Sequence, residues 1–248
     1  VWEIVDNGID EALAGHATSV KVTLLADGGV RVIDDGRGIP TDIHPKTGKS
    51  TLETVLTVLH AGGKFGSGGY KVSTGLHGVG LSVVNALSTK LTAEVRRDGF
   101  AWNQEYALGV PKGPVKKGAA TKQNGTTIRF YPDGTIFETT KFDYEWAVNY
   151  LRHQAYLTKG LKGSVVDENT GQRYGFYFEG GIQSYVHHLN IGKDIISDEI
   201  FYVEKQMDES MVEIAVQYNE GFTESVMAFA NNVYNPEGGT HLTGFRTA

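Results

Sequence analysis

The sequence predicts an α+β protein built on a mixed β-sheet, not a doubly wound one. Strand patterns come first as a hairpin and later alternate with long helical patterns, which is typical of a layered α+β fold. The 248 residues, 40% of them hydrophobic and 21% charged, suit one large domain or one and a half ordinary ones. Eight of the 32 glycines fall within 62–80, where backbone is expected to approach a ligand.

Apolar spacing defines the first elements. Trp2, Val5 and Ile9 form the apolar stripe of a helix over residues 1–14, and Gly15 is its expected C-terminal stop. Residues 19–26 alternate as a strand and lead through an Asp-Gly-Gly turn into a second strand over 30–34. Ser50 followed by Glu53 predicts a capping box that starts the next helix.

The remaining elements follow in the same way. We expect helices over 79–87 and 144–157 and a short helix that ends near residue 189. We expect strands near 91–97, 101–106, 126–131, 164–167, 173–179, 201–204, 212–218 and 225–231. A change in character at Gly181 predicts two domains, residues 1–181 and residues 182–248.

Charge and cysteine content exclude several function classes. A net charge of −6 and a pI near 5.8 argue against a chain whose main task is to hold phosphate backbones. The lack of cysteine excludes disulfides, thiol catalysis and cysteine-ligated zinc. No apolar run approaches the roughly 18 residues of a membrane span, so we expect no membrane partner and a cytoplasmic location. Because Val1 already lies in a helical pattern, we expect a piece of a longer chain.

The first helix carries a candidate pair of polar groups. Glu3 and Asn7 stand four residues apart and project from one helix face. A carboxylate beside an amide can activate a water and hold a magnesium ion, which prefers oxygen ligands. The spacing alone is also common on solvated helix faces, but the acidic surroundings of Asp6, Asp10 and Glu11 favour a cation.

Two glycine motifs add candidate nucleotide contacts. Asp34 ends a strand and begins Asp-Asp-Gly-Arg-Gly-Ile-Pro, where a carboxylate can accept a hydrogen bond from an exocyclic amine, although Asp-Gly pairs also mark ordinary turns. The run Gly75-Leu-His-Gly-Val-Gly80 precedes a helix and predicts a backbone anion cradle, or else a helix-capping loop. It lacks both the P-loop ending and the dinucleotide spacing. Thr126 follows a glycine at the start of a late strand.

The order of these motifs resembles the GHKL ATPase superfamily, which includes type II topoisomerase ATPase subunits, heat-shock chaperones, MutL-type repair proteins and histidine kinases. Longer strings, from Trp2–Asn7 and Asp35–Pro40 to 60–65, 75–87 and 238–241, are similar to the bacterial gyrase B and ParE ATPase region. The likeness implies a two-layer sandwich with helices on one face of a mixed sheet, followed by the start of a transducer-like α/β domain.

The resemblance implies a role for each matching residue. Glu3 would be the general base that polarises the attacking water, and Asn7 would ligate Mg²⁺ bound to ATP. Asp34 would accept from the adenine amino group. The other residues implied to contact ATP are Arg37, Gly38, Ile39, Pro40, Lys64, Tyr70, His77, Gly78, Val79, Gly80 and Thr126.

The resemblance also implies partners and limits. It implies a homodimer that closes on ATP, a gyrase A/ParC-type cleavage subunit as partner, and DNA held mainly by other regions. An upstream arm with a histidine, and a downstream lysine, would lie outside this chain, so we expect ATP binding to exceed hydrolysis. Thr74 stands where the family usually has glycine. An ATP-gated chaperone or MutL-like module is the alternative function, and a histidine kinase is a third.

Overall fold

The computed structural model describes residues 1–61, 78–208 and 210–248. The chain divides into two compact units, which are described separately below. The first unit comprises Val1–Arg152 and Leu161–Phe176, and the second comprises His153–Gly160 and Tyr177–Ala248. The predicted domain boundary at Gly181 therefore lies four residues after the point at which the chain last enters the second unit.

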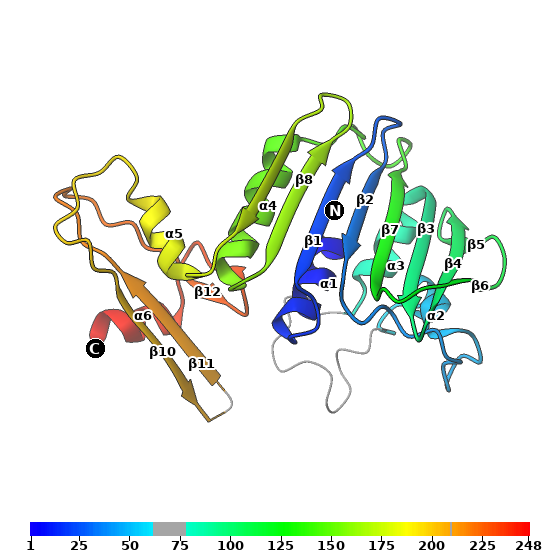
Figure 1. Ribbon diagram of the computed structural model, residues 1–248, viewed down its shortest axis with the longest axis horizontal. Coiled ribbons are helices and arrows are strands. Elements are labelled where there is room, and N and C mark those ends of the chain that lie inside the picture. Colours follow the sequence, from blue (N-terminus) through cyan, green and yellow to red (C-terminus); the bar gives the residue numbers. More distant parts are fainter. Residues whose placement is uncertain (62–77, 209) are drawn as a thin grey trace. The chain divides into compact units, whose positions relative to one another are not determined.

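A nine-stranded mixed sheet forms the first unit, in the order β5-β4-β3-β7-β2-β1-β8-β9, with β6 also paired to β4 (Figure 1). The strands are β1 (Ser19–Leu24), β2 (Val30–Asp34), β3 (Ser88–Arg97), β4 (Phe100–Ala107), β5 (Val110–Pro111), β6 (Lys116–Ala120), β7 (Gly125–Pro132), β8 (Lys162–Asp167) and β9 (Arg173–Tyr177). β1 pairs with β8 in parallel, whereas the β1–β2, β2–β7, β3–β7 and β3–β4 pairs are antiparallel. The predicted mixed sheet is confirmed.

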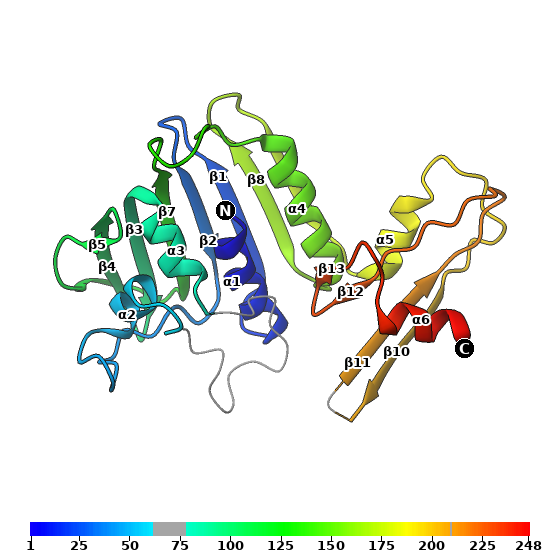
Figure 2. The same cartoon turned by 180° about the vertical axis from the view of Figure 1, so that it is seen from behind.

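Helices cover one face of this sheet, as the view from behind shows (Figure 2). They are α1 (Trp2–Leu13), α2 (Thr51–Thr57), α3 (Gly80–Ala86) and α4 (Tyr144–Leu157). Val5 and Ile9 of α1 are fully buried, as are Val22 of β1 and Val95 of β3. Alternate residues of β2, β3 and β7 are buried over most of their length, as expected for strands with one covered face, whereas Val22, Thr23 and Leu24 of β1 are all buried. The core therefore lies between the helices and the sheet.

Local signals account for most element ends, with one exception. Gly15 adopts φ +77° directly after α1, and the turn between β1 and β2 closes with Gly28 at φ +84°. The predicted capping box at α2 is wrong. Ser50 Oγ donates to the carbonyl of Thr41 and not to the start of the helix. The Glu53 carboxylate forms a salt bridge with Lys49 and accepts a hydrogen bond from Gln104. Both side chains are therefore engaged by partners outside the capping box.

The strands β5 and β6 were not predicted from the sequence. β6 contains Lys-Lys-Gly-Ala-Ala, which has little strand propensity, and all five of its residues are exposed. It forms because β4 offers an edge: Trp102 lies opposite Lys117, and Asn103 lies opposite Lys116. Tertiary pairing thus overrides local preference at this end of the sheet.

The second unit consists of short elements: α5 (Ile182–Leu189), the hairpin β10–β11 (Phe201–Met207 and Ser210–Val216), the hairpin β12–β13 (Phe229–Ala230 and Val233–Tyr234) and α6 (Thr240–Thr247). Tyr156 stacks on Phe178 at 3.7 Å and on Tyr185 at 4.8 Å between ring centroids. The strand expected over 225–231 is wrong apart from Phe229–Ala230, since 225–228 and 231 lie outside any strand. The helix α6 was not predicted.

Candidate functional site

Glu3 lies against the start of α3. A Cβ placed on Gly80 would collide with the carboxylate end of Glu3, so a side chain at position 80 would displace that carboxylate. Glu3 stands on the first turn of α1 and its side chain is exposed. The structure therefore brings the proposed water-activating carboxylate to the C-terminal end of the predicted phosphate cradle.

Asn7 lies one turn further along α1. Its Nδ2 donates a 2.7 Å hydrogen bond to the carbonyl of Glu3, which fixes the amide orientation. With the nitrogen held by the helix backbone, Oδ1 is the atom that remains for a ligand such as a cation. Among the residues that the structure describes, no group of three or more histidine, cysteine or acidic side chains is arranged to hold a metal ion.

Asp34 ends β2 beneath the start of β7. Its Oδ1 accepts hydrogen bonds from the backbone N–H of Gly36 at 2.9 Å and from that of Thr126 at 3.2 Å. Within the described residues, no further donor is bonded to Oδ2. Burial raises the pKa of Asp34 to about 6 in spite of these two hydrogen bonds. This carboxylate is thus partly satisfied and has one oxygen left to accept from a ligand.

The neighbouring Asp35 has a structural role, because its carboxylate is bonded to Thr18 and Ser19. Its carboxylate accepts hydrogen bonds from the N–H and hydroxyl of Thr18 and from the N–H of Ser19, at 2.6 to 2.8 Å. Burial opposes ionisation of Asp35, but these hydrogen bonds outweigh it and lower the pKa. Asp35 therefore secures the start of β1, and only Asp34 is left to face the site.

The turn after β2 is held from two sides. Glu11 of α1 accepts from Arg37 through its backbone N–H at 2.9 Å, its Nε at 3.1 Å and its Nη2 at 2.8 Å. Arg97 of β3 donates from Nη1 to the carbonyl of Gly38 at 2.7 Å. Gly38 has φ +76° and lies so close to β3 that a Cβ would approach the carbonyl of Arg96 at 2.9 Å.

The sequence did not predict that Glu11 and Arg97 hold the turn after β2 in place. In the sequence Glu11 stands out only as one member of an acidic helix, and Arg97 carries no signal beyond its place before an Asp-Gly turn. Both act on backbone at a long sequence distance, which no local pattern reveals. Of the other predicted residues on this turn, Ile39 is half-buried and Pro40 is exposed.

Thr126 and Gly125 complete the site at the start of β7. Thr126 is buried, and its N–H is one of the two donors to Asp34. Gly125 adopts φ +125°, and a Cβ there would lie 2.1 Å from the carbonyl oxygen of Asp34. β7 therefore meets the end of β2 with no space for a side chain between them.

Part of the predicted cradle is described. Gly78, at φ +62°, and Val79 lead directly into α3 at Gly80. Lys64, Tyr70, Thr74 and His77 lie outside the described residues. The described site thus unites α1, the end of β2, the start of β7 and the start of α3, all within the first unit.

None of the helices in the described parts of the chain is both long enough and apolar enough to span a membrane.

Comparison with known proteins agrees with this geometry. The family model of histidine kinase-, DNA gyrase B- and HSP90-like ATPases matches residues 1–136, and the DNA gyrase B model matches residues 181–248. The whole chain is 51% identical to the DNA gyrase B protein of Enterococcus faecalis and 48% identical to that of Streptomyces coelicolor. It spans 39% of the length of each of these relatives.

A solved structure is similar as well. The 43K ATPase domain of Thermus thermophilus gyrase B, solved in complex with an aminocoumarin, matches 99% of this chain with a TM-score of 0.89 at 35% sequence identity. The match covers 63% of that chain.

Proposed function

This chain belongs to the histidine kinase-, DNA gyrase B- and HSP90-like ATPase family, and from that premise we propose that it is the ATP-binding and ATP-hydrolysing region of a bacterial gyrase B/ParE subunit. The single observation that carries the proposal is that α1 contacts both parts of the site: Glu3 lies against Gly80, and Gly8 lies against Asp34, which accepts from the N–H of Thr126. Similarity to gyrase B proteins along the whole chain favours this function over an ATP-gated chaperone or MutL-like module.

The adenine end of ATP fits the surroundings of Asp34. We assign Oδ2 of Asp34 as the acceptor for the exocyclic amino group, with the carboxylate oriented by the backbone N–H groups of Gly36 and Thr126. A charge-assisted hydrogen bond to this carboxylate would favour ligands that carry an amino group at that position over ligands that lack one. Arg37, Gly38, Ile39 and Pro40 would line this end of the pocket.

The phosphate end fits the start of α3. Backbone N–H groups of Gly78, Val79 and Gly80 would cradle the phosphates, together with His77, Lys64 and the lid residue Tyr70. Glu3 would orient and polarise the attacking water, and its carboxylate already lies at Gly80. Phosphoryl transfer needs such positioning and charge neutralisation more than covalent participation of the protein.

A magnesium ion would complete the charge balance. Asn7 presents one amide oxygen, and Mg²⁺ in nucleotide sites takes most of its remaining ligands from phosphates and water. The donor set of this chain therefore fits a metal that arrives with the nucleotide, not one held by a dedicated protein cage. When bound, the ion would neutralise charge that develops on the phosphates.

The proposed activity of the whole protein follows from the gyrase B relationship. ATP would close a homodimeric clamp, and closure would be coupled to DNA strand passage by a gyrase A/ParC-type cleavage subunit, with supercoiling or decatenation as the outcome. We also propose a cytoplasmic location, on the basis of this relationship alone.

Isothermal titration with a non-hydrolysable ATP analogue, with and without Mg²⁺, tests the adenine assignment. Asp34→Ala removes the acceptor and should weaken binding by about 1.5–3 kcal/mol, or roughly 10- to 150-fold. Glu168→Ala, which alters a carboxylate at the far end of β1, is the matched control and should bind normally. Unchanged affinity of Asp34→Ala would show that adenine does not bind at this carboxylate.

Incubation with ATP in place of the analogue separates hydrolysis from phosphotransfer. Glu3→Gln should retain analogue binding and lose release of free phosphate, because the general base is replaced without a change in size. A phosphorylated protein in place of free phosphate would instead support the histidine-kinase alternative.

A further inference from the structure

A basic hairpin lies at one end of the sheet of the first unit. Residues 106–132 contain five basic residues and no acidic one, in a chain whose net charge is −6. Four of the five are Lys112, Lys116, Lys117 and Lys122, and all four are exposed. We call these four residues the hairpin lysines. The fifth, Arg129, is already paired with Asp27.

The hairpin lysines follow one edge of β4. The N–H of Lys112 bonds to the carbonyl of Glu105, and Lys116 and Lys117 lie opposite Asn103 and Trp102. At the other end, the N–H of Thr121, next to Lys122, bonds to the carbonyl of Gly99. The path from Gly99 to Glu105 is six residue steps long, or roughly 20 Å at about 3.4 Å per residue. The four backbone positions are therefore spread along one edge of the sheet, and Lys116 and Lys117, as neighbours in β6, project to opposite faces of that edge.

One acidic residue, Glu105, lies on the same stretch of β4. Within the described residues, none of the hairpin lysines forms a salt bridge with an acidic side chain. Lys117 is instead held over the ring of Phe100, with Nζ 3.4 Å from the centroid, and lies 5.5 Å from the centroid of Trp102. A row of cations without acidic partners complements an extended polyanion better than a single phosphate or a short acidic peptide.

We propose that the hairpin lysines contact the phosphate backbone of duplex DNA without reading its sequence. Duplex DNA carries about one negative charge per 1.7 Å of its axis, so a row of roughly 20 Å meets several phosphates at once. Lysine ammonium groups act as point charges and can contact phosphates without a fixed geometry. The choice of DNA over another polyanion rests on the proposed function, whereas the cation row itself does not.

Edge protection is the competing explanation. Lysines on an exposed edge strand hinder edge-to-edge pairing between sheets, and β6 is such a strand. In that case their replacement would cause self-association and leave DNA binding unaltered. The two explanations therefore predict different results for the same variant.

Fluorescence anisotropy with a labelled DNA duplex of mixed sequence, about 40 base pairs long, tests the proposal on the full 248-residue chain. With about four phosphate contacts, the wild-type affinity should fall roughly 100-fold between about 50 and 200 mM salt. Replacing the four hairpin lysines by glutamine should weaken binding at the lower salt concentration by at least about tenfold and nearly abolish the salt dependence. Replacing them by arginine should preserve both.

A matched control changes the net charge by the same amount elsewhere. Lys141, Lys159, Lys193 and Lys205 are exposed, and their replacement by glutamine should leave affinity within about threefold of wild type. The proposal would be overturned if the two glutamine variants lost the same affinity for DNA, or if the wild type did not bind DNA. It would also be overturned if polyglutamate displaced the labelled duplex as effectively as unlabelled DNA. Binding of the ATP analogue by each variant is measured in parallel, so failure of the nucleotide site is recognised separately.

Discussion

Asp34 and Asp35 are adjacent in sequence and have opposite environments. Asp35 is stabilised as an anion by donors from Thr18 and Ser19, whereas burial holds the pKa of Asp34 at about 6. A buried carboxylate with an elevated pKa costs the folded protein stability at neutral pH, which is common where a site is prepared for a ligand. We therefore expect Asp34 to serve nucleotide binding at the expense of stability.

The substitution Asp34→Asn tests this trade-off by its pH dependence. Because the folded pKa of about 6 exceeds the ordinary 3.8, this carboxyl favours folding most below its ordinary pKa, and that contribution is lost as the pH rises to about 6. The asparagine side chain does not ionise, so the variant should gain stability relative to wild type across this range. Above about pH 6 the difference in free energy of unfolding between variant and wild type should become constant, after a rise of no more than about 3 kcal/mol.

Urea unfolding of both proteins at several pH values between about 4 and 8 measures the difference. An advantage of the variant that shrinks as the pH rises would contradict the assigned environment. The variant should also bind the ATP analogue more weakly at the alkaline end of this range, because the acceptor has lost its charge.

At the scale of elements, the junction of β2 and β7 determines where Asp34 sits. Gly125→Ala should destabilise the first unit by about 2 kcal/mol or more, since φ +125° is strained for alanine and its Cβ would press on the carbonyl oxygen of Asp34. The same substitution should weaken binding of the ATP analogue, because the N–H of Thr126 would move away from Asp34.

Gly113→Ala is the control for this substitution. Its added methyl group would meet nothing within 4 Å, and its backbone is not in a left-handed conformation. We expect a change within about 0.5 kcal/mol in urea unfolding. If Gly125→Ala were equally mild, the close approach of β7 to β2 would not be what positions the carboxylate.

Sequence patterns predicted the elements that depend on local rules. The helix at 2–13, the hairpin from 19 to 34 and the strands that carry Leu91 and Ile128 all follow from apolar periodicity and turn residues. The strand β6, the helix α6 and the partners of Ser50 depend on neighbours distant in sequence. The same limit applies to the site, where Glu3 and Asp34 could be nominated but the hydrogen bond from Arg97 to Gly38 could not.

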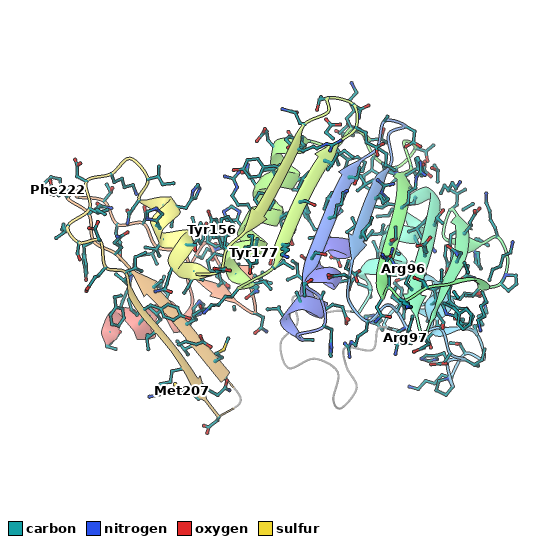
Figure 3. All side chains as sticks on the ribbon, viewed as in Figure 1. Arg96, Arg97, Tyr156, Tyr177, Met207 and Phe222 are labelled. Atoms are coloured by element: carbon teal, nitrogen blue, oxygen red, sulfur yellow. The ribbon has the colours of Figure 1, made fainter. Side chains whose placement is uncertain are left out.

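At the scale of the whole molecule, every described site residue belongs to one unit. Glu3, Asp34, Gly80 and Thr126 lie in Val1–Arg152, whereas the exposed apolar side chains of Met207 and Phe222 belong to the second unit (Figure 3). A ligand stabilises the state to which it binds, by about 2.7 kcal/mol at roughly 100 times its dissociation constant. For this chain we expect that stabilisation to be concentrated in the first unit.

Hydrogen exchange followed by mass spectrometry tests this expectation with and without a saturating ATP analogue. Peptides from α1, the end of β2 and the start of β7 should exchange more slowly with the analogue, because the ligand bridges these segments. Peptides from the β10–β11 hairpin should be unaffected, and Asp34→Ala should reduce the protection of the first unit in proportion to its weaker binding. Equal protection of β10–β11 in the wild type would mean that the nucleotide orders both units together, and the site would then need residues from each.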